Sequence, residues 1–208
     1  MELLHKGEIE ASLASSDSDS LFIDPLLDAG QIGAVTVDLR LGCDFLVSIL
    51  TRKPSIDIGQ VEGELTRGIG SYFQETRREL GEMFVLYPSQ VVLATTLEYV
   101  SLPRNVYADV LSRSSYTRIG IHINTMIQPG FRGCFPLELF NHGNNAVQLV
   151  VGSRICQARL FRTPESHSYV DGKTSRKYYG DVRPTVSRAD EDADIARLRK
   201  GAGLLDTQ

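Results

Sequence analysis

The sequence lacks the residues and runs that mark membrane, secreted or disulfide-bonded proteins. No stretch approaches the roughly 18 consecutive apolar residues that a membrane-spanning helix requires. The opening residues, MELLHKGEIEAS, carry acidic side chains where a signal peptide has its long apolar core. The three cysteines, Cys43, Cys134 and Cys156, are odd in number and form no C-x-x-C pair. We therefore predict reduced thiols in a cytoplasmic protein.

An excess of positive charge is also lacking. The 26 acidic residues outnumber the 22 lysines and arginines, which gives a formal net charge of −4. This balance predicts no general affinity for nucleic acid or for an anionic membrane. A highly charged anionic ligand would need a local group of cations, and the candidates cluster in SRSSYTR (112–118) and SRKYYGDVRPTVSR (175–188). Any one of these cations taken singly is by default solvated surface.

Residues for metal-dependent or nucleophilic chemistry are scarce as well. The zinc deaminase signature is His-x-Glu followed by Pro-Cys-x-x-Cys, and the chain contains neither element. The four histidines lack the i, i+4 spacing of a helical metal site. No serine or cysteine stands in a G-x-S-x-G setting. We therefore predict neither a zinc site made by this chain alone nor a nucleophilic triad.

What the sequence does contain is a series of short β-type runs separated by Gly, Pro and Asn. These runs cover residues 34–41, 83–87, 90–97, 105–112, 119–124, 134–141, 146–151 and 155–161. Their spacing predicts an all-β fold, either a barrel or a jelly-roll-like sandwich. A chain of 208 residues is long enough to give such a fold one substantial core.

Other segments depart from this pattern. Residues 6–15, KGEIEASLAS, have helical spacing and are followed by a Ser/Asp-rich loop. Residues 51–82 form a polar excursion in which SYFQETRREL (71–80) predicts a short helix. Residues 189–200 predict another helix, with acids near its N-terminal end and bases near its C-terminal end. The polar tail 163–208 is either disordered or folds across a neighbouring surface.

The segment LSRSSYTRIG (111–120) predicts an end of a strand that is rich in hydrogen-bond donors. Two hydroxyls, Ser114 and Ser115, lie between Arg113 and Arg118. Guanidinium groups offer a planar fork of donors that never deprotonates, so this combination could cradle phosphate oxygens. The alternative is that R-S-S forms an ordinary turn.

Glu138 lies in the run GCFPLELFN (133–141), whose other residues are typical of a buried β-strand. Strand alternation directs Phe135, Leu137 and Leu139 to one face, and Cys134, Pro136, Glu138 and Phe140 to the other. Glu138 is then either a solvated or ion-paired surface residue or a shielded carboxylate. In the second case burial would raise its pKa and suit it to accept and donate protons.

Five segments taken together resemble one family. They are AVTVDLRLG (34–42), FVLYPSQVVLATTLEYVSLP (84–103), SRSSYTRIG (112–120), QPGFRGCFPLELFN (128–141) and RKYYGDVRPTVSR (176–188). In this order they resemble the successive motifs of deoxycytidine triphosphate (dCTP) deaminase, a member of the trimeric dUTPase superfamily. The resemblance covers about residues 33–188 and leaves both ends of the chain weakly matched.

The resemblance implies a distorted β-barrel or jelly roll, assembled as a homotrimer with active sites at the subunit interfaces. It also implies zinc-independent hydrolysis of dCTP to dUTP and ammonia, with Mg²⁺ bound through the triphosphate. By resemblance we divide the chain into an N-terminal helix and loop segment (1–32), a barrel core (33–162) and a C-terminal arm and tail that close over an active site (163–208).

The resemblance also implies which residues carry the chemistry. Glu138 matches the essential acid, with Ser114 and Arg118 placing the attacking water. The implied nucleotide-binding residues are Arg113, Ser114, Ser115, Tyr116, Thr117, Arg118, Gln128, Pro136, Leu137, Glu138, Tyr169, Lys177 and Asp181.

The chain departs from the family pattern around the sugar and the base. Gln128 replaces the aspartate that bonds the deoxyribose 3′-hydroxyl, and the segment 120–128 is shorter than in the deaminases. In the arm, Asp181 replaces a glutamine and Arg183 replaces the glycine before a proline, while Tyr169 lies one residue from the expected position. The residues that match the phosphate-binding motif and the acid agree with the family pattern. The residues implied to recognise the sugar and the base differ from it.

Two alternatives therefore stay open. One is a bifunctional enzyme or a pure dUTP diphosphatase, against which Gln128 argues mildly because that chemistry also relies on the missing aspartate. The other is a non-catalytic nucleotide-binding regulator on the same trimeric scaffold.

Overall fold

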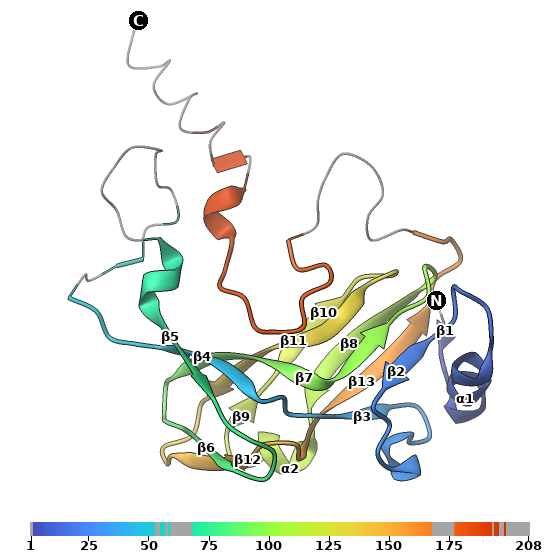
Figure 1. Cartoon of the computed structure of the whole chain (residues 1–208), viewed down its shortest axis with the longest axis horizontal. Coiled ribbons are helices and arrows are strands. Elements are labelled where there is room, and N and C mark those ends of the chain that lie inside the picture. The colour runs from blue at the N-terminus through green and yellow to red at the C-terminus, as the bar shows by residue number, and fades with distance from the viewer. Residues whose placement is uncertain are drawn as a thin grey trace, which may run out of the picture. The chain divides into compact units, whose positions relative to one another are not determined.

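Strands are the main regular secondary structure in the described part of the chain (Figure 1). The structure is a computed structural model that describes residues 2–52, 55–56, 58, 68–167, 177–192, 194–195 and 198. The chain divides into two compact units. The first unit comprises residues 1–47 and 75–185, and the second comprises residues 48–74 and 186–208.

The described strands form two large sheets and a two-stranded one. The five-stranded sheet has the order β1 (Glu2–Leu3), β13 (Arg154–Arg162), β8 (Val106–Ser112) and β10 (Asn124–Ile127), with β3 (Val37–Arg40) also paired to β13. The six-stranded sheet has the order β5 (Phe73–Arg77), β4 (Asp44–Ser48), β7 (Val91–Ser101), β11 (Arg132–Asn141) and β9 (Ile121–His122), with β2 (Phe22–Asp24) also paired to β7. The two-stranded sheet joins β6 (Met83–Leu86) to β12 (Val147–Val150).

Short helices complete the described chain. They are α1 (Lys6–Ala14), α2 (Ser114–Thr117) and the 3₁₀ turns η1 (Ala29–Gln31), η2 (Ile69–Tyr72) and η3 (Ala189–Glu191). None of the helices in the described residues is long and apolar enough to cross a membrane. In the second unit, η2 is tied to the residues before it, because Ile49 N donates to the Tyr72 carbonyl at 2.9 Å and the Tyr72 hydroxyl donates to the Ser55 carbonyl at 3.0 Å.

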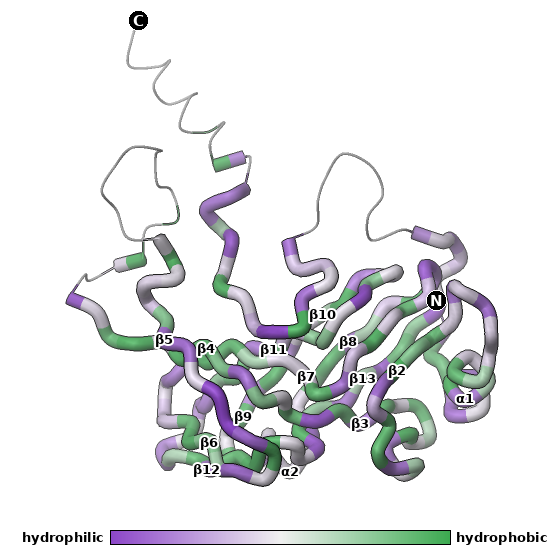
Figure 2. The backbone as a smooth tube through the Cα atoms, in the orientation of Figure 1, coloured by the Kyte–Doolittle hydropathy of each residue, from purple (hydrophilic) through white to green (hydrophobic). Residues whose placement is uncertain are grey.

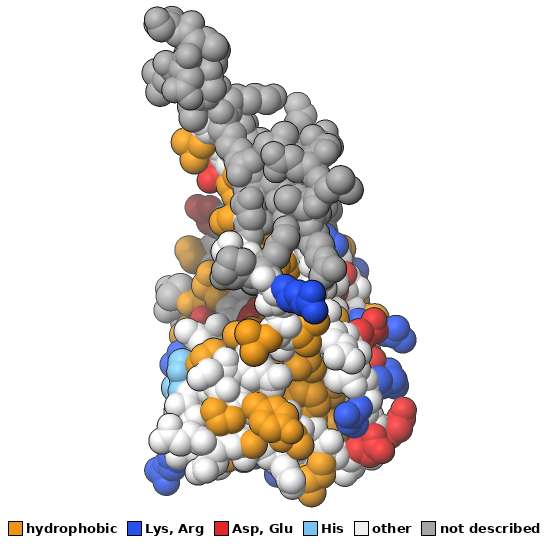
Figure 3. Space-filling view, turned by 90° about the vertical axis from the view of Figure 1, so that its left-hand side faces the viewer, with side chains coloured by type: hydrophobic (Ala, Val, Ile, Leu, Met, Phe, Trp, Pro, Cys, Tyr) orange, Lys and Arg blue, Asp and Glu red, His pale blue; other side chains and the backbone are white. Residues whose placement is uncertain are grey.

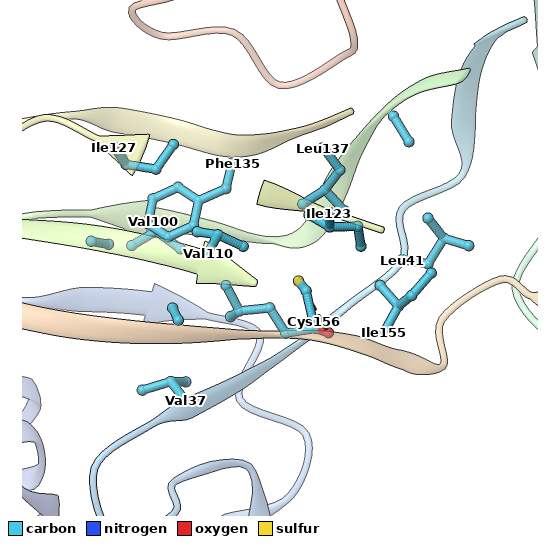
Figure 4. Packing of buried hydrophobic residues seen from close by; sticks show 14 of the residues in the cluster. Val37, Leu41, Val100, Val110, Ile123, Ile127, Phe135, Leu137, Ile155 and Cys156 are labelled. Atoms are coloured by element: carbon cyan, nitrogen blue, oxygen red, sulfur yellow. Dashed lines mark hydrogen bonds between the residues drawn. The ribbon is translucent and has the colours of Figure 1, made fainter. Parts of the chain in front are cut away.

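One hydrophobic core fills the first unit. It includes Phe135 and Leu137 from β11, Val110 from β8 and Ile155 from β13, all almost fully buried (Figure 4). Hydrophobic and hydrophilic stretches alternate along the strands, as the pleat of a half-buried sheet requires (Figure 2). Burial of the inward residues supplies the main stabilising free energy of such a fold.

Some apolar side chains stay on the surface. In the β6–β12 pair, Met83 and Val150 lie opposite each other, and their exposed fractions are 55% and 39%. Apolar side chains also gather on the face of the molecule seen in Figure 3.

The predicted all-β class is confirmed, and each of the eight predicted runs overlaps at least one strand. The helix predicted at 6–15 is α1. The helix predicted at 71–80 is wrong: η2 ends at Tyr72 and the chain continues as β5, whose Phe73 has extended φ and ψ of −127° and 144°. β5 lies beside β4, and Nη1 of Arg77 at its end donates to both carboxylate oxygens of Asp44 at 3.0 Å. Tertiary pairing therefore overrides the local helical propensity.

The helix predicted at 189–200 begins as the 3₁₀ turn η3, and most of its remaining residues lie outside the described part. The N-terminal segment takes part in both large sheets, because β1 pairs with β13 and β2 pairs with β7. The division of the chain at residues 32 and 162 stays a prediction.

A glycine ties α2 to the end of β11. Gly120 has a φ of +93°, donates to the Thr117 carbonyl at 3.0 Å and accepts from the His142 N–H at 2.8 Å. A Cβ atom at this position would lie 2.5 Å from the backbone nitrogen of Gly143. Both the conformation and the space therefore require glycine here.

We expect Gly120→Ala to lower the free energy of unfolding more than Gly81→Ala does. Gly81 has a similar φ of +86° but meets nothing within 4 Å, so its substitution costs only conformational strain, about 1–2 kcal/mol. Urea unfolding of the two variants measures the difference. Equal losses would show that the approach of Gly120 to Gly143 does not constrain the fold.

Candidate functional site

The α2 turn is held by a set of local hydrogen bonds. The Arg113 carbonyl accepts from the N–H groups of Tyr116 and Thr117 at 2.9 and 3.1 Å. The hydroxyls of Ser112 and Thr117 lie 2.9 Å apart. These bonds fix a one-turn helix after β8, where the sequence predicted only the end of a strand.

A pocket of about 360 Å³ lies beside this turn. Its lining residues are Thr36, Leu111, Ser112, Ser114, Thr117, Arg118, Gln157 and Arg159. Ser114, Thr117 and Arg118 were predicted as site residues, and the structure brings them together here. Hydroxyls, an amide and two guanidiniums among these residues make a donor-rich lining that suits an anion.

The other predicted residues of this segment lie elsewhere. Ser115 is exposed and is not among the lining residues. The Tyr116 hydroxyl lies 3.2 Å from the Ser153 hydroxyl, and its ring packs against the core. Arg113 does not line the pocket either, because its guanidinium pairs with Asp38 at 3.4 Å and donates to the Arg154 carbonyl at 3.2 Å.

Glu138 points outward from β11, as its strand position predicted. Its neighbours Leu137 and Leu139 are buried in the core, whereas Glu138 is exposed in the single chain. Glu138 lies opposite Leu93 of β7, which in turn lies opposite Leu46 of β4. Directly opposed residues share a face of a sheet, so the carboxylate ends a row of two leucines.

Desolvation by the surrounding protein raises the pKa of the Glu138 carboxyl above its usual value. Hydrogen bonds from its own backbone N–H and from the Thr125 hydroxyl of β10 act in the opposite direction, because they favour the carboxylate. A carboxyl with a raised pKa and a hydroxyl partner can take up and return a proton near neutral pH more readily than a fully solvated one.

Within this one chain, Glu138 is not among the residues that line the pocket. The pocket is built from β8, α2, β13 and Thr36, whereas Glu138 belongs to the other large sheet. The chain therefore presents the acid and the donor-rich pocket as two separate surfaces.

Cys134 was expected on the same face as Glu138, and unlike Glu138 it is buried. Between Cys134 and Pro136 the partner strand β7 advances four residues, from Tyr99 to Thr95, so the extra residues of this irregularity lie on β7. Burial raises the pKa of the Cys134 thiol to about 11 and raises that of Cys156 as well, so neither thiol is a ready nucleophile.

The beginning of the arm pairs with β11 in the same chain. Gly180 N donates to the Arg132 carbonyl at 2.8 Å, and Cys134 N donates to the Asp181 carbonyl at 3.0 Å. Gly133 permits this approach, because a Cβ there would lie 2.6 Å from the Asp181 carbonyl oxygen. The predicted residue Asp181 thus uses its backbone to dock the arm, and its carboxylate accepts from the Thr185 hydroxyl at 3.2 Å.

The remaining predicted residues are placed as follows. Lys177 is half-buried, and Tyr169 lies outside the described residues. Gln128 is half-buried in the turn before β11, and its carbonyl accepts from Phe131 N at 3.3 Å. The Leu137 side chain lies in the core, so only its backbone could meet a ligand, whereas Pro136 is half-buried.

Sequence reasoning did not name six residues of these two surfaces. The pocket is also lined by Thr36, Leu111, Ser112, Gln157 and Arg159, and Thr125 bonds Glu138. Thr36, Leu111 and Ser112 lie inside the segments 34–42 and 111–120, whereas no sequence pattern marks the other three. Among the described residues, no group of three or more His, Cys, Asp or Glu is arranged to hold a metal ion.

We expect Thr125→Val to raise the pKa of Glu138 further, because this isosteric change removes a hydrogen bond that favours the carboxylate. Thr125→Ser keeps the hydroxyl and should leave the pKa near that of the unmodified protein. Titration of the glutamate side-chain carboxyls by ¹³C NMR measures both variants. A pKa that does not change in Thr125→Val would show that the hydroxyl does not act on Glu138.

The chain was compared with families and proteins of known identity. A family model described as dCTP deaminase-like matches residues 3–163. A "dCTP deaminase, dUMP-forming" of Methanobrevibacter smithii is 35% identical over 87% of this chain and 93% of its own length. A protein of the same description from Methanothermobacter thermautotrophicus is 38% identical over 85% and 90%.

A solved structure is similar as well. It is 2′-deoxycytidine 5′-triphosphate deaminase from Agrobacterium tumefaciens, with a TM-score of 0.56 and 26% identity over 76% of this chain and 47% of that chain. The sequence match, which covers most of the chain, and the shared all-β architecture lead to one assignment. The chain belongs to the dCTP deaminase-like family.

Proposed function

We propose that the chain hydrolyses dCTP to a deoxyuridine nucleotide and ammonia. The observation that carries the proposal is Glu138, an outward carboxyl of β11 whose pKa is raised by desolvation and which accepts a hydrogen bond from Thr125. The family relationship and the names of the similar proteins support the choice of dCTP.

In the proposed reaction Glu138 is the general base and then the general acid. Its carboxylate takes a proton from water as the water oxygen forms a bond to C4 of the cytosine ring. The proton passes to ring N3, the C4–N4 bond breaks, and the amino group leaves as ammonia after it gains a second proton from the attacking water. A carboxyl whose pKa is raised by desolvation suits both proton transfers, because it can accept the proton from water and then return it.

The donor-rich pocket is the proposed site of the triphosphate. Ser114 and Arg118 line it, and their hydroxyl and guanidinium groups match phosphate oxygens. No carboxylate is among its lining residues. Mg²⁺ would therefore be held by the phosphates and by water rather than by a protein cage, which is its usual manner in nucleotide enzymes.

We further propose that copies of the chain assemble as a homotrimer in which each active site is shared between subunits. The separation of Glu138 from the pocket within one chain supports this arrangement, because a second copy could bring its own Glu138 to the pocket. Lys177 of the arm is proposed to meet the phosphates, and a cytoplasmic location stays part of the same prediction.

A second candidate function differs from the first in its product, which would be dUMP rather than dUTP. Both similar archaeal proteins are named as dUMP-forming, which supports a bifunctional enzyme that also hydrolyses the triphosphate to a monophosphate and pyrophosphate. Gln128 is the residue that argues for deamination alone, since it replaces the family aspartate that the second hydrolysis requires.

One assay separates these candidates. The protein is incubated with Mg²⁺ and dCTP, dCMP, CTP or dUTP, and ammonia and pyrophosphate are both measured. Ammonia alone from dCTP indicates a deaminase, equal amounts of both products indicate a bifunctional enzyme, and nucleotide binding without either product indicates a regulator.

Glu138→Gln should abolish release of ammonia while it leaves dCTP binding nearly unchanged, because the amide keeps the shape of the side chain but cannot accept the proton. Glu10→Gln, the same change at an exposed glutamate of α1, is the matched control. Retention by Glu138→Gln of more than about a tenth of the wild-type rate would remove Glu138 from the role of general base.

A further inference from the structure

The guanidinium of Arg113 uses Nε and Nη1 in contacts within the protein and leaves Nη2 for a ligand. Its Nε lies 3.4 Å from an Asp38 carboxylate oxygen, and its Nη1 donates to the Arg154 carbonyl at 3.2 Å. Its backbone N–H is also fixed, because it donates to the Ile155 carbonyl at 3.0 Å. Within the described part of the chain, Nη2 donates no hydrogen bond. Arg113 is half-buried, and its neighbours Ser112 and Ser114 both line the pocket.

Asp38 is itself held firmly. It lies opposite Gln157 in the pairing of β3 with β13, and the Gln157 amide donates to its other oxygen at 3.0 Å. Val37 and Leu39 on either side are fully buried in the core, which fixes the backbone. The Asp38 residue is only 8% exposed, and Arg154 lies 3.7 Å away as a second cation.

A buried polar network also fixes the backbone of Asp38. The amide of Gln31 donates to the Asp38 carbonyl at 3.1 Å and to the Glu98 carboxylate at 3.0 Å. Glu98 in turn accepts from the Arg40 backbone N–H at 2.9 Å. Gln31 and Glu98 are completely buried. Asp38 is thus anchored by its side chain, by its backbone and by both neighbouring core residues.

We propose that Asp38 is a positioning residue that holds the Arg113 guanidinium so that its open Nη2 edge meets the phosphates of the bound nucleotide. This inference rests on the proposed function, since it names a residue that acts on the phosphate end of that substrate. An arginine that is already ordered loses little side-chain entropy on binding, so a fixed guanidinium binds phosphate more tightly than a mobile one.

The direction in which Asp38→Asn changes the phosphate affinity distinguishes a positioning role from a purely electrostatic one. Asp38 is an anion near a proposed binding site for a polyanion. Its neutralisation by Asp38→Asn would strengthen phosphate binding if charge alone mattered. If Asp38 instead positions Arg113, the same substitution weakens binding, because the amide no longer fixes the guanidinium.

The test uses inorganic tripolyphosphate and dCTP as probes in titration calorimetry, with the full chain. We expect Asp38→Asn to weaken the affinity for both probes about tenfold and to raise KM for dCTP by a similar factor, with kcat at saturation nearly unchanged. In an Arg113→Gln background, Asp38→Asn should add no further loss, because its effect passes through Arg113. Arg154→Gln is the matched control, since it removes the other cation beside Asp38 and should leave both affinities near the wild-type values.

The other possible results of these titrations also decide whether Asp38 positions Arg113. Unchanged or tighter binding of tripolyphosphate in Asp38→Asn, or a full additional loss in the Arg113→Gln background, overturns the inference, as does a wild-type protein that does not bind tripolyphosphate. Should Asp38→Asn fail to fold because two arginines lose their counter-charge, Asp38→Asn combined with Arg154→Gln relieves that repulsion and makes the same comparison. A wild-type protein that binds tripolyphosphate but releases no ammonia from dCTP would refute the proposed function and leave the role of Asp38 to be judged on binding.

Discussion

The pleat of β11 is the constraint on which the proposed chemistry depends. Alternation along this strand buries Leu137 and Leu139 in the core and leaves the intervening Glu138 facing outward. Because its neighbours on both sides are locked in the core, the backbone of Glu138 has no freedom to turn. The adjoining leucines of β7 and β4 and the hydroxyl of Thr125 then set the environment of the carboxyl. A core made of ordinary aliphatic packing thereby positions an acid with a raised pKa.

The proposed phosphate-binding pocket and the acid lie on different sheets. Phosphate binding is proposed at a pocket on the five-stranded sheet and the α2 turn, whereas the acid stands on the six-stranded sheet. Neither surface alone accounts for deamination, because the base must be attacked while the phosphates are held. A shared site between copies resolves this separation without any rearrangement of the core. Shared sites would also explain why the proposed trimer forms, whether or not assembly stabilises the fold.

Much of the fold follows from sequence alone because alternation and turn residues are local signals. The predicted runs contain strands, and the outward position of Glu138 follows from the parity of β11. The exceptions have tertiary causes. Residues 73–77 are a strand because β4 offers them an edge, and Cys134 is buried at the point where Asp181 docks on β11.

The site was less accessible to sequence reasoning for the same physical reason. The contact of Asp38 with Arg113 and the hydrogen bond of Thr125 to Glu138 join residues that only strand pairing brings together. Their side chains carry no local signature, since aspartate and threonine occur on many strands. The resemblance to a family suggested an acid and a phosphate motif, but it did not indicate that Asp38 pairs with the Arg113 guanidinium.

The central claim is that the acid of one copy serves the pocket of another, and subunit complementation tests it most directly. Glu138→Gln and Arg118→Ala are each expected to be inactive alone. After the two variants are unfolded together and reassembled in equal amounts, about a quarter of the sites should combine an intact pocket with an intact acid, and that fraction of the wild-type activity should return. A mixture no more active than its separate parents would contradict the shared site.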